Sequence, residues 1–319
     1  MSEKNAAMPT KKVGMANKFT KSKVKDGIFY AAMTALPLLQ FLIFYVGVNF
    51  NSILLAFQNI NSEGKVVGWG FGNFVSQWKI LTADSTLADL TKLSVLMYVL
   101  NVAFGIVLGL FFSYYISKKM PLSGMFRVVL FLPSIVSSIV FVVIYEKAVN
   151  FVLPDLMKKL FKVKVDPLLL TEKTRTVTII VYNLIVSFGT NVLMFSNAMT
   201  GISPEIVDAA KLDGATGVKE FRYVTVPCVY PTISTFIIIG VAGIFTNQMN
   251  LYSFQNGSVD SNAKTFGYYL YKLVADAQYT DRTMDYTSLS ALGLMYSVVA
   301  LPLTFGVKFL VEKFGFKED

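Results

Sequence analysis

Side chains that usually perform catalysis are scarce in this 319-residue sequence, which contains no histidine and only one cysteine, Cys228. A disulfide within the chain, a His–Cys metal site and histidine-based acid–base catalysis are therefore excluded. The ATP-binding pattern G-x-x-x-x-G-K-[ST] is also absent, because the single Gly-Lys pair, Gly64-Lys65, is followed by Val66. These residue types favour recognition of a solute or a partner over bond-making chemistry by this chain.

Neutral polar side chains inside long apolar segments are the candidates for solute contact. Asn183, Ser187 and Asn191 are four residues apart, which on a helix makes one continuous stripe. Amides and hydroxyls can hydrogen-bond to sugar hydroxyls, although any single amide could equally link two helices. Polar groups in a membrane are costly unless they face a cavity or one another. The predicted substrate pathway comprises Asn183, Ser187, Asn191, Asn247, Gln248 and Asn250.

A charged loop, residues 203–231, separates two of the apolar segments and has a defined helix start. The Ser203 hydroxyl can cap the first free amides, and Pro204 at the first helical position has no amide proton to leave unpaired. Glu205 follows in the first turn, where a negative charge interacts favourably with the helix dipole. The loop is therefore predicted to begin with a short helix.

Small residues dominate one face of this predicted helix. Ile206, Ala209 and Ala210 are three and four residues apart, so they form a narrow face that a partner's backbone can approach closely. Gly214 is suited to end the helix in a left-handed conformation. The first helix is thus expected to be short and closely packed against a partner.

A second amphipathic stretch follows in the same loop, with Val218 and Phe221 three residues apart. Pro227 and Pro231 bracket the start of the next apolar segment. We expect two short helices at an angle to each other on one face of the membrane.

The elements that must position these residues are strongly apolar: 54% of the residues are hydrophobic, 15% are charged and the mean hydropathy is +0.55. About 18 to 20 apolar residues span the hydrocarbon of a bilayer, so each charge-free segment of that length predicts a transmembrane helix. The stretch 128–143, which is continuously apolar apart from serines, excludes the alternation of a membrane barrel. The six segments are 27–62, 93–117, 128–145, 176–204, 223–259 and 286–307.

The sequence therefore predicts an all-α, polytopic membrane protein with six transmembrane helices. A basic cytoplasmic segment, 1–26, precedes a transmembrane domain, 27–315, which contains the loop 203–228. The first apolar segment is too long for the core of a cleaved signal peptide. Gly105 and Gly109 form a small-xxx-small pair that permits close contact between helices.

The net charge of +9 is concentrated near the N-terminus, where seven lysines lie in the first 25 residues. This arrangement favours contact with the anionic cytoplasmic leaflet over nucleic acid, and six spans place both termini in the cytoplasm. Lys118, Lys119 and Arg127 then fall in an internal loop, as the positive-inside rule requires. The loop 146–175 disagrees because it carries seven basic residues on the external side; its amphipathic pattern predicts a folded external segment.

Residues 208–227, DAAKLDGATGVKEFRYVTVP, resemble the cytoplasmic signature loop of permease subunits of binding-protein-dependent ABC importers. That loop reads Glu-Ala-Ala, three residues, a glycine, and later an aliphatic–x–Leu–Pro ending. Asp208 and Val226 stand where the family usually has glutamate and leucine. The matching positions here are Asp208-Ala209-Ala210, Gly214-Ala215, Phe221 and Val226-Pro227.

The resemblance extends over most of residues 28–312 and is greatest for the carbohydrate-uptake branch that includes maltose-type permeases. It implies a type I ABC importer permease fold, in which the loop 203–228 docks into a separate ATPase and couples it to alternating access. The implied coupling residues are Glu205, Asp208, Ala209, Ala210, Asp213, Gly214, Ala215, Phe221 and Pro227.

The same resemblance implies several partners in the cytoplasmic membrane of a prokaryote. They are a second permease subunit forming a heterodimer, a cytosolic ABC ATPase dimer, an extracellular or periplasmic solute-binding protein, and a sugar or oligosaccharide substrate. This chain would bind no cofactor itself, since ATP and Mg would be used by the ATPase.

Three alternatives remain open at this level. One is an importer permease for another small solute, such as glycerol phosphate. Another is an intramembrane enzyme, for example a lipid-modifying transferase, although no reactive constellation of acids, histidines or cysteines is evident. An ion-driven transporter is disfavoured because no carboxylate lies deep in a predicted span.

Overall fold

The computed structural model describes residues 13–61, 65–83, 85–255, 263–280 and 283–316. The chain forms two compact units, Met1–Leu55 and Ala56–Asp319. Most of the predicted basic segment, 1–26, lies outside the residues whose side chains are described.

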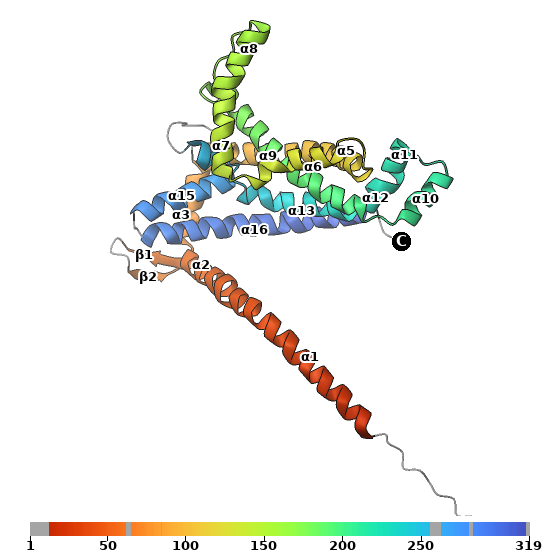
Figure 1. The fold of residues 1–319 in the computed structure, drawn as a ribbon. Helices are drawn as coiled ribbons and strands as arrows, with labels where there is room; N and C mark the ends of the chain where they lie inside the picture. Colours follow the sequence, from red (N-terminus) through yellow and green to blue (C-terminus); the bar gives the residue numbers. More distant parts are fainter. Residues whose placement is uncertain (1–12, 62–64, 84, 256–262, 281–282, 317–319) are drawn as a thin grey trace, which may run out of the picture. The chain divides into compact units, whose positions relative to one another are not determined.

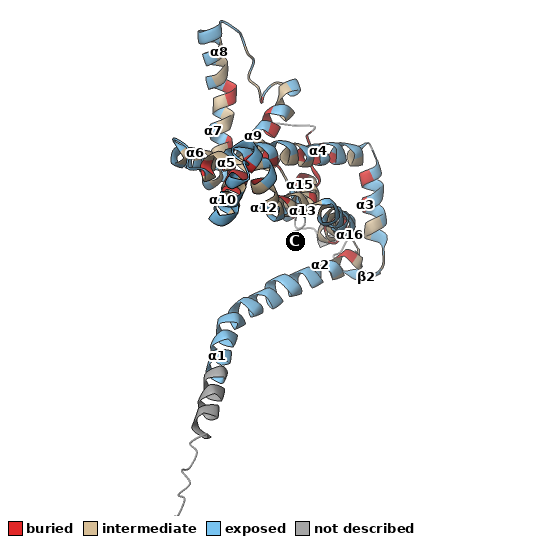
Figure 2. Cartoon of the chain, turned by 90° about the vertical axis from the view of Figure 1, so that its right-hand side faces the viewer, coloured by how far each residue is buried: buried red, intermediate tan, exposed pale blue. Residues whose placement is uncertain are grey.

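From Val13 onward, the first unit is one continuous helical run. Helix α1 (Val13–Gln40) passes through a π-helical stretch, η1 (Phe41–Gly47), into α2 (Val48–Phe57), which reaches the second unit. The 34-residue span Val24–Phe57 buries none of its most apolar window, as the exposed colouring in Figure 2 shows. Such a surface suits lipid or another membrane helix.

The second unit begins with a small antiparallel hairpin, which the sequence did not predict, and continues as helices (Figure 1). Segments labelled η are π-helical. The elements are β1 (Gln58–Ile60), β2 (Val66–Trp69), α3 (Gly72–Thr82), α4 (Thr86–Leu100), η2 (Asn101–Ile106), α5 (Val107–Ser117), α6 (Ser123–Ile135), α7 (Ser138–Lys147), η3 (Ala148–Val152), α8 (Leu153–Phe161), α9 (Glu172–Thr200), α10 (Pro204–Leu212), α11 (Val218–Glu220), η4 (Phe221–Thr225), α12 (Val226–Cys228), α13 (Tyr230–Thr246), α14 (Leu251–Gln255), α15 (Phe266–Thr280) and α16 (Thr283–Phe314).

Four helical segments within the described residues are long and apolar enough to cross a membrane by themselves. Two further pairs meet the criterion together but are bent, one by 105° and one by 62°. Counting each bent pair as one span gives six, so the predicted helical membrane fold is confirmed. The segments are Val24–Phe57, Thr86–Ser117, Glu172–Thr200 and Tyr286–Phe314, with the pairs Ser123–Ile135 plus Ser138–Phe161 and Val218–Cys228 plus Tyr230–Thr246.

The third predicted span is not a straight helix, contrary to the sequence prediction. Helix α6 ends at Ile135, and both Val136 and Ser137 adopt extended ψ angles, 140° and 130°. The Ser137 carbonyl then accepts the first backbone bond of α7, from Phe141. The absence of charged residues shows that a segment can lie in the membrane. It does not show whether the segment forms one straight helix.

The fifth predicted span is also interrupted. Helix α13 ends at Thr246, and Met249 and Asn250 both have a φ of 53° in the following turn. The expected placement of Asn247 and Asn250 on a helix is therefore wrong. Left-handed backbone at two successive positions is incompatible with a continuing right-handed helix.

Helix α9 packs closely against α5 and η2, as the Gly105–Gly109 pair predicted. A Cβ at Gly105 would lie 2.6 Å from Nδ2 of Asn191, and a Cβ at Gly109 would lie 3.3 Å from the Phe195 ring. Since lipid gives no hydrophobic drive for helix association, such close packing is a main source of stability here.

The contact between α9 and α6 is closer still. A Cβ on Gly189 would lie 1.9 Å from the carbonyl oxygen of Leu130, and backbone atoms cannot rotate away as a side chain can. Nearby, the buried Ser113 hydroxyl donates to the Val192 carbonyl at 2.8 Å, which links α5 to α9. The backbones of α6 and α9 therefore meet directly.

We expect Gly189→Ala to destabilise the protein by about 1–3 kcal/mol, because it overpacks this contact. The measurement is thermal unfolding of the purified chain in detergent. Gly306→Ala, also within a helix but with nothing within 4 Å of the added methyl, is the control and should change stability little. Equal melting temperatures for the two variants would contradict the close α6–α9 contact.

Candidate functional site

The loop 203–228 forms two short helices at one end of the second unit, with α10 and α11 beside each other in Figure 1. At the start of α10, the Ser203 hydroxyl accepts from the Glu205 amide at 3.3 Å and also contacts the Glu205 carboxylate. Pro204 occupies the first helical position. The helix start predicted from the sequence is confirmed.

Helix α10 ends in a complete Schellman motif. Gly214 has a φ of +78°, its amide bonds to the Lys211 carbonyl at 3.0 Å, and the Ala215 amide bonds to the Ala210 carbonyl at 2.8 Å. These two bonds satisfy carbonyls that a helix end otherwise leaves free. The turn is consequently rigid.

The predicted coupling residues on α10 lie at the surface. Asp208 is exposed and pairs with Lys211 at 2.8 Å, and this hydrogen bond raises the pKa of Lys211. Such an exposed pair contributes little to stability. Glu205, Ala209, Asp213 and Gly214 are also exposed, whereas Ala210 and Ala215 are partly buried. The exposed acids and small residues are accessible to a partner.

Two exposed apolar side chains extend this surface beyond the residues predicted from the sequence. Leu212 is 91% exposed and Val218 is 81% exposed, on the two sides of the Gly214 turn. Isolated large apolar residues are common on surfaces, but these two flank the Schellman turn that ends α10. Val218 belongs to the amphipathic stretch that the sequence predicts, whereas Leu212 is distinguished only by its exposed position beside the turn.

A partly buried ion pair anchors the second helix of the loop to the end of α5. Residue Glu220 is 4% exposed, and its carboxylate pairs with the Lys118 ammonium, which also lies 5.4 Å from the centre of the Tyr114 ring. The Tyr114 hydroxyl donates to the Gly217 carbonyl at 3.1 Å. The sequence places Lys118 only in an internal basic loop, and no local pattern distinguishes Glu220.

Phe221 belongs to the same anchor. Its ring centre lies 5.3 Å from that of Phe111 and 5.0 Å from that of Tyr114. Pro227 then lies in α12, before the 62° bend into α13. The loop is thus joined by packing to α5 and by the backbone to α13.

The predicted pathway residues on α9 make contacts between segments. The Asn183 amide donates to the Met249 carbonyl at 3.0 Å, and the Ser187 hydroxyl donates to the Asn101 side chain at 2.9 Å. Asn191 is buried against Gly105. The stripe therefore faces the protein interior, and Asn183 and Ser187 also serve as links between segments.

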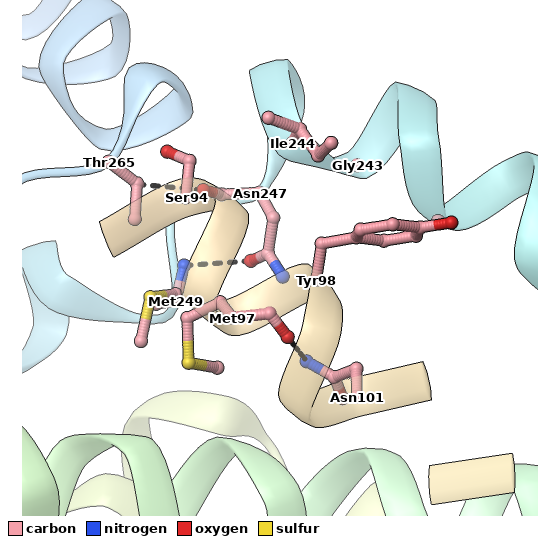
Figure 3. A pocket seen from close by; sticks show the side chains of 10 residues that line it. Ser94, Met97, Tyr98, Asn101, Gly243, Ile244, Asn247, Met249 and Thr265 are labelled. Carbon is pink, nitrogen blue, oxygen red and sulfur yellow. Dashed lines mark hydrogen bonds between the residues drawn. The ribbon is translucent and has the colours of Figure 1, made fainter. Parts of the chain in front are cut away.

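A cavity of about 130 Å³ lies beside this stripe (Figure 3). The Asn247 side chain accepts from the Met249 amide at 2.8 Å, and the Thr265 hydroxyl donates to the Asn247 carbonyl at 2.8 Å. Gln248 and Asn250 are partly buried in the same turn but do not line the cavity. The lining residues are Ser94, Met97, Tyr98, Asn101, Gly240, Gly243, Ile244, Asn247, Met249 and Thr265.

The cavity is smaller than the roughly 300–1,000 Å³ of sites that enclose a small ligand. Its lining contains no charged residue. Asn101, which is not among the residues predicted for the substrate pathway, is a lining residue and the partner of Ser187. It is the only amide in the charge-free segment 93–117, a signal that could have identified it.

The chain is similar to known proteins over a region that includes the loop 203–228 and most of the residues that line the cavity. Residues 101–315 match the family described as "Binding-protein-dependent transport system inner membrane component". The chain is 22% identical over 264 residues to the multiple sugar-binding transport system permease protein MsmF of Streptococcus mutans, covering 82% of this chain and 88% of that protein. It is 25% identical over 269 residues to the arabinooligosaccharides transport system permease protein AraP of Bacillus subtilis, covering 82% of each.

Among solved structures, the chain is similar to a chain of a bacterial ABC transporter involved in the import of the acidic polysaccharide alginate. The TM-score is 0.71 at 19% sequence identity, with 93% of this chain and 99% of that chain covered. At this identity the likeness establishes the shared fold.

We expect Lys118→Met to lower the free energy of unfolding by about 1–3 kcal/mol, because it leaves the buried Glu220 carboxylate without its partner. A double-mutant cycle with Glu220→Gln, measured by chemical unfolding in detergent, should show that the two effects do not add. Lys211→Met, which removes the exposed pair with Asp208, is the matched control and should have little effect. Additive effects of Lys118 and Glu220 would show that the pair does not anchor the loop.

Proposed function

The chain belongs to the family of binding-protein-dependent transport system inner membrane components, and from this premise we propose that it moves a sugar or oligosaccharide across the cytoplasmic membrane of a prokaryote by alternating access. The resemblance drawn from the loop 208–227 is thereby confirmed at the level of the family. The sugar is supported by the names of the relatives and by the uncharged lining of the interior cavity.

The observation that carries the proposal is the rigid, exposed helix α10 joined to two spans. A separate ABC ATPase dimer, using ATP and Mg, would grip α10 across its small face and the apolar residues Leu212 and Val218. The Schellman turn at Gly214 resists bending, and the Lys118–Glu220 pair passes displacement to α5. Pro227 and the bend before α13 pass it to the fifth span.

The size of the interior cavity supports a second permease subunit as partner. At about 130 Å³ the cavity is too small to enclose an oligosaccharide within one subunit, so the pathway would be completed at a heterodimer interface. The extensive exposed apolar surface of Val24–Phe57 is available for such a partner. An extracellular or periplasmic solute-binding protein would deliver the substrate, and both termini would be cytoplasmic.

The alternative cargo, a phosphorylated solute such as glycerol phosphate, would need cationic groups along the path. The cavity lining offers amides, hydroxyls, two thioethers and a phenol ring, which suit neutral hydroxyl groups better. No catalytic constellation among the described residues favours the enzyme alternative.

The proposed function predicts ATP-dependent sugar uptake by proteoliposomes that contain this chain with its second permease, its ATPase and its binding protein. Uptake should require ATP inside or outside according to the orientation of the ATPase, and omission of this chain should abolish it. Transport by this chain in an ion gradient without any ATPase would overturn the proposal.

In the same assay we expect Gly214→Val to reduce uptake at least about tenfold, because a β-branched residue in the left-handed conformation costs on the order of 1–2 kcal/mol and distorts the turn. Gly214→Asn is the matched control, since asparagine tolerates this conformation and should retain most of the uptake. Membrane insertion and expression should be normal in both. Equal uptake by the two variants would show that the turn does not transmit motion.

A further inference from the structure

We propose that helix α8 and the lysines that follow it, residues 153–164, bind anionic phospholipid headgroups on the membrane face opposite α10. The folded segment expected within 146–175 is confirmed: α7, η3 and α8 form one continuous helix, Ser138–Phe161. In Figure 1 its α8 end stands away from the rest of the second unit. The inference does not depend on the identity of the transported solute.

The direction of this helix follows from its connection to α6. The segment between α5 and α6 lies on the same side as the loop 203–228, because Lys118 pairs with Glu220. Helix α6 then runs along α9, and the chain bends by 105° before α7. The third span therefore turns at this bend, and its α8 end runs at a steep angle to α9 on the membrane face away from α10.

Specific contacts hold the base of this helix in place. The Tyr182 hydroxyl donates to the Ser138 carbonyl at 3.3 Å, and the Tyr145 hydroxyl donates to the Thr178 carbonyl at 2.9 Å, so α7 is fixed to α9 at two points. The buried Asn150 side chain accepts from the Leu169 amide at 2.9 Å, which fixes the returning chain. Since the helix is continuous, α8 inherits this orientation.

The two sides of α8 differ in chemistry. Leu153, Leu156 and Leu160 are three and four residues apart on one side, and Leu160 is 69% exposed. Lys158 and Lys159 project from the other side. An exposed apolar side opposite a basic side is the pattern of a helix lying in a bilayer interface.

Charge favours an anionic surface. Residues 153–164 contain four lysines and one acid, Asp155, whose carboxylate is already paired with Lys159 at 2.7 Å. Lysine stems can lie along apolar surface while the ammonium groups reach phosphates. An acidic protein would satisfy the lysines but would leave the exposed side chains of Leu160 and Phe161, 65% exposed, without an apolar environment. A bilayer offers an apolar environment to the leucine side of α8 and phosphates to its lysine side. It is also consistent with the orientation of the helix.

The test uses the full chain in nanodiscs of phosphatidylcholine with phosphatidylglycerol. A fluorophore is attached at Leu160→Cys in a Cys228→Ser background, and quenching is compared for nitroxide-labelled phosphatidylglycerol and nitroxide-labelled phosphatidylcholine. We expect about fivefold stronger quenching by the anionic lipid, equivalent to about 1 kcal/mol for one lysine near an anionic surface. In a Lys158→Gln/Lys159→Gln/Lys162→Gln variant the preference should disappear.

A fluorophore at Leu212→Cys, on α10, is the control for a water-exposed site and should show neither strong quenching nor lipid preference. Equal quenching by the two lipids with the lysines intact, or a preference that survives their replacement, would overturn the proposal. Shielding of the label that appears only when the solute-binding protein is added would also overturn it and would assign α8 to a protein partner.

Discussion

The structure of the second unit depends on the close packing of α9 against the two helices beside it. In a bilayer, lipid tails are as apolar as the side chains, so helices associate through close packing and hydrogen bonds rather than through burial of apolar surface. Gly105 and Gly109 on one side and Gly189 on the other permit this approach. The Ser113 hydroxyl adds a bond to the α9 backbone.

This packing determines where the loop 203–228 is held. Helix α5, positioned by α9, ends at the residues that contact the second helix of the loop, Tyr114 and Lys118. A displacement of α10 is therefore opposed by a helix that is itself packed over its length. The partly buried Lys118–Glu220 pair strengthens this contact, because separating the two residues would leave the Glu220 carboxylate without a compensating charge.

Broken helices are tolerated where neighbouring groups form hydrogen bonds with the backbone N–H and C=O groups that the break leaves unpaired. In the turn after α13, the Met249 amide donates to Asn247, and its carbonyl accepts from Asn183. The Thr265 hydroxyl satisfies the Asn247 carbonyl. Irregular backbone at membrane depth is stable only when it is buried in protein or lines a cavity, and this turn does both. The polar residues predicted as a pathway thus also stabilise the interruption that forms the cavity.

The sequence by itself determined the helical membrane fold, the six apolar segments and the start and end of α10. These features depend on composition and on chemistry within a few residues: the Ser203 hydroxyl reaches the Glu205 amide, and Gly214 adopts the left-handed conformation without steric cost. The Gly105–Gly109 pair likewise predicted a close contact between helices, but it did not indicate that the partner is α9.

Only the tertiary structure decided the features that join distant segments. Lys118 and Glu220 are 102 residues apart, and Asn101 and Ser187 are 86 residues apart. The bend after α6 is set by contacts with Tyr182 and Tyr145, and the turn after α13 is set by Asn183 and Thr265. A local pattern specifies which conformations a segment tolerates, whereas hydrogen bonds and packing from the rest of the fold select the one that it adopts.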